Sequence, residues 1–450
     1  MEKFKKIWFV FLLIVLSIPM MQNLTGWFEE KPLNGAYIPA VRPEFSFKSI
    51  WNETYQDSAI KYIEENIGFH NTLVRLNNQM IFSCFHESPI KGPVLGKEKM
   101  LFEDSYIVSY TGQTFLGDNK IEEISTDLKT AQEIMKQHGV NLIVILTPGK
   151  ASFYPELIPD RFHPERKSRN NYDAYIEYLT NNEVNFIDFN SYICNMRDTA
   201  TEALYCSLSA HWTLYAAVLS LDSTINYMES ITNKDYADFT ITDFEKSDTL
   251  RNQDNDLYKT MNIMFLPKHN EINYPVLKFN NGTDKIKPKV LAIADSYWWT
   301  LYAYKVEIPQ KLFSDGGFWF YNNTIYPVRE PIQNVENINY FDEVNAQDFV
   351  LIVTTEATNH LFPYDFCVKY LTSYEKEFVK KSETNELTSV DTMYLDFKER
   401  QIQTIISEIK SNQEWLNNIK KQAEEKNIDI ETMIWQNADY SYKSKAGLIK

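Results

Sequence analysis

The sequence is poor in residues that build metal and redox sites, with four cysteines and seven histidines among 450 residues. The cysteines show no CxxC spacing, which argues against a zinc knuckle or a thioredoxin-like site. The histidines show no HExxH or other ligand spacing. We therefore expect no metal and no cofactor. Two states of the cysteines stay open, free thiols or one disulfide, for which Cys194 and Cys206 are the nearest pair in sequence.

The chain also lacks an excess of positive charge. Its 45 Lys and Arg residues face 61 Asp and Glu residues, a formal net charge of -16. Binding to a phosphate backbone needs a basic surface, so nucleic acid is not an expected partner. A hydrophobic share of 44% excludes a disordered or fibrous chain. Aromatic residues reach 14%, and they can serve either as core or as platforms for sugar rings.

One long apolar run stands at the N-terminus, where three lysines precede Ile7–Met21. Basic residues stay on the cytoplasmic side, so we expect the rest of the chain outside the cytoplasmic membrane. No small-x-small cleavage pattern follows the run, which favours an uncleaved signal anchor over residues 1–25, held in the membrane by residues 7–25. A cleaved signal and a secreted protein is the alternative, because about 20 apolar residues are needed to span a bilayer and this run is short.

Residues 26–95 are predicted to be a stalk followed by a helical lead-in. The stretch to Phe47 is rich in Pro, Gly and aromatic residues without periodicity. Between Lys48 and Phe85 apolar residues recur at helical spacing, which predicts two helices separated by Gly68. These apolar residues are Ile60, Ile63, Ile67, Leu73, Leu76 and Met80.

Residues 96–375 alternate between short β runs and helical stretches, which predicts a three-layer α/β domain with a mainly parallel sheet. Unbroken apolar runs suit strands covered on both faces. The predicted strands are Asn141–Thr147, Val184–Phe189, Val290–Ala294 and Phe349–Thr354, and the predicted helices are Ile121–His138, Tyr172–Leu179 and Trp212–Met228. Residues 229–287 are polar and are predicted to be an insertion. Residues 376–450 are predicted to be a C-terminal helical extension that packs on the domain.

Two sequence features lie where an α/β sheet places its chemistry, at the carboxyl ends of strands. The strand Val290–Ala294 runs into Asp295 and Ser296, and a serine at such a junction is exposed beside backbone N–H groups that can stabilise an oxyanion. The alternative is that Ser296 only caps the helix. His211 lies on a loop just before a predicted helix, and a purely structural histidine is its alternative.

Together these features resemble a family. A strand that ends in Asp-Ser, preceded in sequence by a His-Trp-Ser/Thr element, is similar to the alginate O-acetyltransferase group of SGNH-hydrolase-like proteins. Three further stretches resemble the family in the same order between about residues 60 and 360. They are Asn66–Arg75, Gly96–Phe102 with Met100 in place of the usual tryptophan, and Thr147–Glu156, which is similar to a "P-x-K-x-x-x-Y-P-E" pattern.

The resemblance implies an SGNH-like fold and a Ser-His-Asp triad, with the serine at Ser296 and the histidine at His211. It implies transfer of an acetyl group to a polysaccharide hydroxyl through an acyl-serine, with acetyl supplied by a membrane-bound O-acyltransferase. The family's "D-x-H-W" aspartate falls on Ser209, which cannot supply the negative charge. Three outcomes stay open. Ser209 would orient His211 in a slower dyad, or another acid such as Asp198 or Glu356 would take the place of the missing aspartate. Alternatively, the protein would have lost turnover and kept sugar binding.

Five more residues are predicted, less specifically, to contact substrate: Asp295, Tyr297, Lys150, Tyr154 and Trp212. For Lys150, Tyr154 and Trp212 a structural role is the alternative. Three functions stay open at this stage. They are an O-acetyltransferase acting on an exopolysaccharide or other cell-envelope glycan, a carbohydrate esterase with the same acyl-serine, and a glycan-binding or assembly subunit without catalysis.

Overall fold

The computed structural model describes residues 2–35, 40–52, 54–302, 307–329, 332–384 and 386–449. At its centre is a seven-stranded sheet in the order β10-β9-β8-β7-β11-β3-β4. Strands β8, β7, β11, β3 and β4 are parallel, and β9 and β10 add an antiparallel edge. The strands are β3 (Asn141–Thr147), β4 (Phe186–Asp188), β7 (Lys289–Ala294), β8 (Ser314–Phe320), β9 (Thr324–Arg329), β10 (Ile332–Asn334) and β11 (Phe349–Thr355).

The four strands expected from the sequence are β3, β4, β7 and β11, so the prediction of a mainly parallel α/β sheet is confirmed. Strands β8, β9 and β10 were not predicted. Gly316 and Gly317 interrupt the apolar run of β8, and Pro327 lies within β9. Glycine and proline weaken the strand signal in a sequence, although proline is tolerated near a sheet edge.

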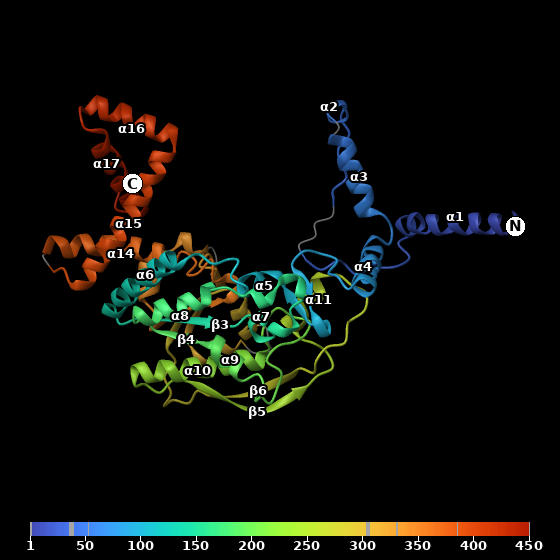
Figure 1. The fold of residues 1–450 in the computed structure, drawn as a ribbon, viewed down its shortest axis with the longest axis horizontal. Coiled ribbons are helices and arrows are strands. Elements are labelled where there is room, and N and C mark those ends of the chain that lie inside the picture. The colour runs from blue at the N-terminus through green and yellow to red at the C-terminus, as the bar shows by residue number, and fades with distance from the viewer. Residues whose placement is uncertain are drawn as a thin grey trace.

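Helices cover both faces of the sheet. Alternate residues of β3 pack into two separate cores, Ile143 and Ile145 into one and Leu142 and Val144 into the other, as the two-residue period of a strand requires. Figure 1 shows α6 and α8 on one side of β3 and β4, and α9 and α10 on the other. The covering helices are α5 (Asp104–Tyr110), α6 (Asp118–Gln137), α7 (Lys150–Phe153), α8 (Asn171–Asn181), α9 (Phe189–Asn195), α10 (Leu214–Thr232), α12 (Ile308–Leu312) and α13 (Tyr340–Asn345).

The polar stretch 229–287 is more ordered than its composition suggests. It holds an antiparallel pair, β5 (Asp238–Lys246) with β6 (Asn273–Asn280), and the short helix α11 (Asp256–Thr260). Its buried residues Phe239, Leu257 and Met261 join the same core as α10. The sequence did not show this core because single apolar residues, separated by irregular polar stretches, have no periodicity to detect.

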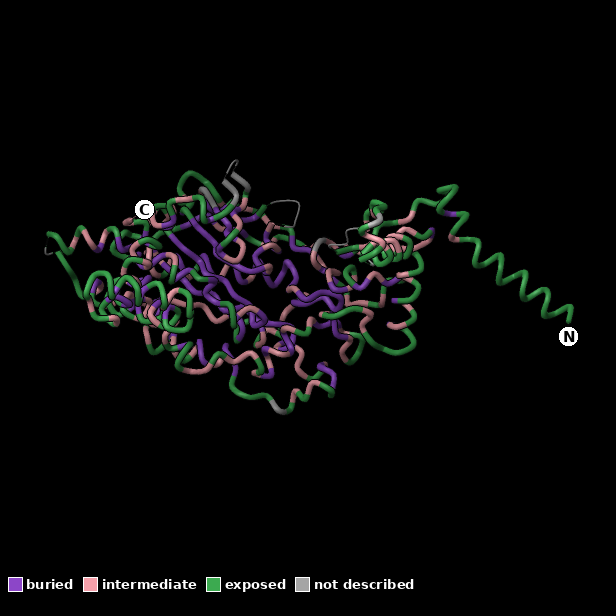
Figure 2. Tube along the Cα trace, turned by 90° about the horizontal axis from the view of Figure 1, so that it is seen from above, coloured by how far each residue is buried: buried purple, intermediate pink, exposed green. Residues whose placement is uncertain are grey.

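The N-terminal residues stand away from the domain (Figures 1 and 2). Helix α1 (Glu2–Thr25) is the one helix in the described part of the chain that is long and apolar enough to cross a membrane. The lead-in contains α2 (Phe47–Trp51), α3 (Thr54–Asn66), α4 (His70–Met80) and a wider helical turn, Ile81–Phe85. The predicted pair of helices around Gly68 is confirmed as α3 and α4. The hairpin β1 (Pro93–Leu95) and β2 (Leu101–Glu103) then leads into the domain.

The C-terminal helices are α14 (Phe366–Thr384), α15 (Ser389–Ser411), α16 (Gln413–Lys426) and α17 (Ile430–Lys445). Helix α14 and the first half of α15 pack on the domain through Tyr370, Tyr374 and Phe397. The second half of α15 forms a separate small core with α16 and α17. Figure 1 shows this bundle projecting from the domain. The expectation that the extension packs on the domain is therefore right for its first part only.

All four cysteines are free thiols. Cys194 and Cys206, the pair considered for a disulfide, are not joined. Burial raises the pKa of each of these two thiols to about 12. A thiol that stays protonated at neutral pH is a poor nucleophile and a poor metal ligand.

Candidate active site

Ser296 lies at the carboxyl end of β7, where the strand turns into a 3-10 helix, Ser296–Leu301. The preceding Asp295 caps this helix, because its carboxylate accepts a hydrogen bond from the backbone N–H of Tyr297 (3.0 Å). Ser296 is half-buried, whereas its neighbours Asp295 and Tyr297 are buried. The strand-to-helix junction predicted from the sequence is confirmed, and it presents the serine hydroxyl at the sheet edge.

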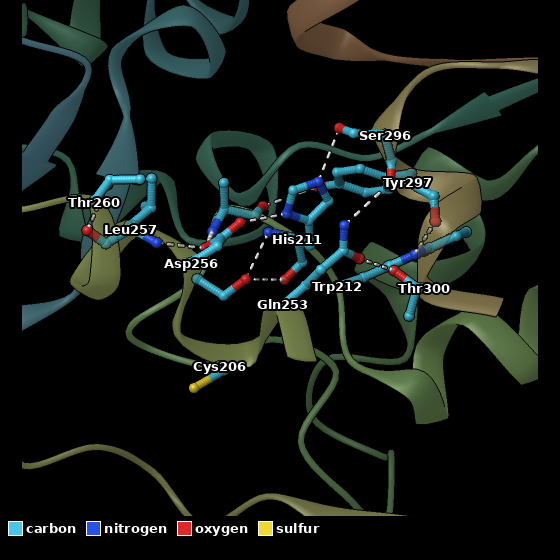
Figure 3. A network of polar contacts seen from close by, with 12 residues as sticks. Cys206, His211, Trp212, Gln253, Asp256, Leu257, Thr260, Ser296, Tyr297 and Thr300 are labelled. Carbon is cyan, nitrogen blue, oxygen red and sulfur yellow. Dashed lines mark hydrogen bonds and ion pairs between the residues drawn. The ribbon is translucent and has the colours of Figure 1, made fainter. Parts of the chain in front are cut away.

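His211 lies beside Ser296, at the same edge of the sheet. It precedes α10, which Thr213 caps by accepting a hydrogen bond from the N–H of Ala216. The ring Nε2 of His211 lies 2.8 Å from the Oγ of Ser296, although the two residues are 85 positions apart in the chain (Figure 3). The two residues singled out in the sequence are thus within hydrogen-bonding distance.

The acid behind the histidine is Asp256, at the start of α11. Its Oδ2 lies 2.5 Å from Nδ1 of His211. Its Oδ1 accepts hydrogen bonds from the backbone N–H groups of Ala210 (3.0 Å) and Leu257 (2.6 Å). Figure 3 shows Asp256, His211 and Ser296 in one continuous line of contacts. An acid supplied from the polar stretch 229–287 was not predicted from the sequence.

The acids considered from the sequence lie elsewhere. Asp198 is exposed. Glu356 is buried and accepts hydrogen bonds from the amide of Asn190 (2.7 Å) and the backbone N–H of Gly149 (3.2 Å). It also accepts one from the hydroxyl of Ser152. Neither carboxylate contacts the ring of His211, so the suggestion that Asp198 or Glu356 replaces the missing aspartate is wrong.

Ser209 does not take the role of the missing aspartate either. Its Oγ accepts a hydrogen bond from the backbone N–H of His211 (2.9 Å), and the ring Nδ1 bonds to Asp256 instead. Ser209 is fully buried. Serine hydroxyls often bond to backbone two residues on, which stabilises a turn. Ser209 therefore shapes the turn before His211, and its assignment as a catalytic residue is corrected.

The contacts settle which nitrogen of His211 carries the proton. An ionised carboxylate only accepts hydrogen bonds, so Nδ1 donates to Asp256 and Nε2 is left to accept from the Ser296 hydroxyl. Burial lowers the pKa of His211, but the charge of Asp256 and the hydrogen bond to it outweigh burial and leave this pKa above its ordinary value. Burial raises the pKa of Asp256, but His211 and the two backbone N–H donors outweigh it and leave this pKa lowered.

Asp295 ties the serine turn to the next strand. Its Oδ2 accepts from the backbone N–H of Thr355 (2.8 Å), the last residue of β11, and from the hydroxyl of Thr358 (2.6 Å) in the 3-10 turn that follows. Together with the N–H of Tyr297, these two groups give the Asp295 carboxylate three hydrogen-bond donors, and the residue is only 1% exposed. Asp295 is therefore a positioning residue, and the prediction that it contacts substrate is wrong. The Tyr297 amide is also committed to Asp295, so it is not an oxyanion donor in this structure.

Lys150 holds the turn that carries His211. Its ammonium group is buried and donates to the backbone carbonyls of Leu101 (3.0 Å), Cys206 (2.5 Å) and Ser209. Burial lowers the pKa of Lys150 to about 8. The ammonium group faces inward, so the prediction that Lys150 contacts substrate is wrong and its structural alternative holds.

The aromatic residues named from the sequence are mainly core. The ring of Tyr297 packs against His211 and Trp212, and its hydroxyl donates to the carbonyl of Ala210 (3.1 Å). Trp212 donates from Nε1 to the carbonyl of Tyr297 (3.3 Å). Both are buried, so they support His211 rather than contact a sugar, and that prediction is corrected. Tyr154 is half-buried under the guanidinium of Arg197, and its contact with substrate stays a prediction.

Two residues near the triad were missed by sequence reasoning. The side-chain amide of Gln253 donates to the carbonyl of Ser296 (3.5 Å) and accepts from the hydroxyl of Thr300 (2.9 Å), which supports the serine turn. Glu103, at the end of β2, lies close enough for the charges of His211 and Asp256 to act on it, and burial raises its pKa. Within the described residues no group of three His, Cys, Asp or Glu side chains is arranged to hold a metal ion.

Part of the chain is similar in sequence to a known family. Residues 94–272 match a family model described as "SGNH hydrolase-like domain, acetyltransferase AlgX". The matched stretch includes His211 and Asp256 and ends before Ser296. No curated protein matches the sequence.

Several solved structures are similar to the chain, each with a TM-score of 0.40. The O-acetyltransferase domain of Pseudomonas putida AlgJ is 16% identical, over 60% of this chain and 93% of that one. Pseudomonas aeruginosa AlgX is 12% identical, over 62% and 67%. Bacillus cereus PatB1 with a sulfonyl adduct is 11% identical, over 59% and 96%. Residues 94–272 of the chain are therefore similar to the SGNH hydrolase-like domain of the acetyltransferase AlgX.

Proposed function

We propose that the chain is an O-acetyltransferase that acetylates an exopolysaccharide or other cell-envelope glycan through an acyl intermediate on Ser296. The observation that carries this proposal is the unbroken chain of contacts from Asp256 through His211 to Ser296. A hydroxyl nucleophile, a base beside it and a carboxylate that orients the base form the arrangement that nucleophilic acyl transfer requires. Because Asp256 supplies the charge that Ser209 lacks, an active enzyme is favoured over a binding subunit.

In the first half of the reaction the Oγ of Ser296 attacks the carbonyl carbon of the donor's acetyl group. Nε2 of His211 accepts the hydroxyl proton as the new C–O bond forms. The tetrahedral intermediate then collapses, the bond to the donor group breaks, and His211 returns the proton to that group. Asp256 stabilises the positive charge that the ring carries between these two proton transfers.

In the second half a sugar hydroxyl takes the place of the donor. His211 removes the hydroxyl proton, the sugar oxygen attacks the acetyl carbonyl, and the bond to Ser296 breaks. The proton then returns to the serine. Water in place of the sugar would make the protein a carbohydrate esterase, so the two activities differ only in the acceptor.

We further propose that this chemistry takes place outside the cytoplasmic membrane. Helix α1 would anchor the chain, with the lysines before it on the cytoplasmic side. Acetyl would then have to reach the site from within the cell, and a membrane-bound O-acyltransferase is the partner we expect to deliver it.

The triad can be tested with the detergent-solubilised full chain and a chromogenic acetyl ester. We expect Ser296→Ala to abolish turnover and Asp256→Asn to lower kcat by roughly 10³- to 10⁴-fold, because the neutral amide no longer stabilises the charged ring. Ser209→Ala is the matched control, because it removes only a turn contact, and we expect less than about a tenfold loss. A larger loss in Ser209→Ala than in Asp256→Asn would contradict the assignment of the acid.

Acceptor choice is tested by adding an oligosaccharide to the same reaction and analysing the products by mass spectrometry. Acetylated sugar that depends on Ser296 supports transfer. Release of acetate alone, unchanged across several acceptor glycans, supports an esterase. Glycan binding without turnover in any variant would support a binding subunit.

The pH dependence of turnover gives a second prediction. His211 accepts a proton only when neutral, and its pKa lies above the ordinary value. We therefore expect activity to fall on acidification with a midpoint above about 6.5, the ordinary pKa of histidine. Asp256→Asn removes the charge that raises this pKa, so the midpoint of the remaining activity should move to lower pH. An unchanged midpoint in Asp256→Asn would show that the titrating group is not His211.

Lys150 gives a third prediction, about positioning. Lys150→Met keeps the length of the side chain but leaves three buried carbonyls without their donor. We expect a loss of roughly 1–3 kcal/mol in the free energy of unfolding per lost contact that stays unsatisfied. We also expect a lower kcat, because the turn before His211 shifts, with little change in KM. Lys97→Met, at an exposed lysine that pairs with Asp160, is the control and should leave both quantities nearly unchanged.

A further inference from the structure

The two lead-in helices carry apolar stripes that face solvent. Ile60 and Ile63 on α3, and Ile67 directly after its end, recur at intervals of three and four residues, and their exposed fractions are 55%, 64% and 41%. Leu73, Leu76 and Met80 repeat the same spacing along α4, with 46%, 53% and 51% exposed. An apolar stripe at this spacing is the face that a helix normally buries. The apolar residues that predicted these helices are therefore not buried in a core of this structure.

The stripe on α4 points away from the enzyme domain. The domain contacts the other side of the helix, where the amide of the buried Asn78 donates to the carbonyl of Met261 (2.8 Å). Phe82, one turn further on, is buried in the main core. The face of α4 that is already covered is therefore not the apolar one, and something outside the domain must cover the stripe.

The junction of α3 and α4 lies beside the end of α1. Gly68, between α3 and α4, is packed against the last turns of α1, since a Cβ there would lie 2.0 Å from the carbonyl oxygen of Pro19. The end of α1 is also fixed, because Gln22 exchanges two hydrogen bonds with the backbone of Phe28 (2.6 and 3.2 Å). Figure 1 shows α3 and α4 running across the direction of α1, at the end where it joins the protein. If α1 crosses a bilayer, both helices lie along its surface.

The same region exposes aromatic residues of the kind that membrane interfaces favour. Trp27 and Phe28 directly follow α1, with 64% and 63% exposed, and Trp51 precedes α3 with 89% exposed. Tryptophan and other aromatic side chains are enriched at the level of the lipid headgroups. Large apolar side chains that are exposed in such number on neighbouring segments are typical of an interaction site.

We propose that α3 and α4 form an interfacial platform that rests on the lipid surface. Their apolar stripes enter the headgroup region beside the point where α1 leaves the bilayer. Three contacts with the membrane, α1, α3 and α4, then fix the height and tilt of the domain, so that Ser296 stays at one distance from the membrane. This inference depends on the membrane insertion of α1 and is independent of the reaction at Ser296.

The test compares two labelled positions on α3 in the full chain, reconstituted in vesicles of phosphatidylcholine and phosphatidylglycerol. In a Cys84→Ser background, Ile63→Cys places a nitroxide on the stripe, and Lys61→Cys places one on the other face at a position that is also exposed. Spin-label accessibility is measured for oxygen, which concentrates in lipid, and for a water-soluble nickel chelate. We expect oxygen to be favoured several-fold more at position 63 than at position 61.

A second pair of variants tests the same surface through charge. We expect Ile63→Glu/Leu76→Glu to reduce contact with brominated lipids, measured as quenching of tryptophan fluorescence. Ser58→Glu/Lys61→Glu adds charge to the polar face of α3 and should leave the quenching unchanged.

Equal access of the nickel chelate to positions 61 and 63 would overturn the proposal, since the stripe would then face water. Dipolar broadening at position 63 that persists on dilution with lipid would overturn it in favour of a second copy of the chain. Release of the full chain from vesicles by alkaline carbonate would show that α1 is not inserted in the membrane, and it would therefore also overturn the proposal. Turnover of the acetyl ester by the same variants reports separately on the proposed reaction.

Discussion

The site depends on one interaction, the hydrogen bond between Nδ1 of His211 and the carboxylate of Asp256. It joins the turn before α10 to the start of α11 and leaves Nε2 facing Ser296. Two backbone N–H groups hold the other oxygen of Asp256, so the carboxylate is fixed before any substrate binds. A fixed charge beside the ring lowers the cost of forming the imidazolium, which is the part of acyl transfer that a protein can prepare in advance.

The three triad residues lie on segments that other buried polar groups hold in place. Asp295 ties the end of β7 to β11, and Lys150 gathers three carbonyls around the turn that precedes His211. Both residues matched sequence patterns near the site, yet both point into the protein. Buried charged groups of this kind are costly unless every donor and acceptor is used. Because their hydrogen-bonding groups are used inside the protein, Asp295 and Lys150 position the reacting residues and do not form the sugar-binding surface.

The sequence was informative where a local pattern carried the signal. Four apolar runs predicted the strands β3, β4, β7 and β11. Ser296 and His211 were singled out because each lies just before a helix and because together they resemble a family pattern. Asp256 had no such signal. It lies 45 residues beyond His211 in a stretch with many acidic residues, and only folding selects it from its neighbours. The sequence also did not show that Lys150, Tyr297 and Trp212 are buried, and these residues were therefore predicted to contact substrate. For α3 and α4 the apolar spacing predicted the helices correctly, but it did not show that the apolar residues are exposed.

The central claim is that Ser296 carries the acetyl group. The most direct measurement is a rapid acid quench of the full chain during turnover of an acetyl ester, followed by proteolysis and mass spectrometry of the peptides. The account predicts an acetyl group on the peptide that contains Ser296, formed within the first turnover and transferred when a glycan acceptor is added. Product formation with acetyl on another residue, or with no acylated peptide at any quench time, would contradict it.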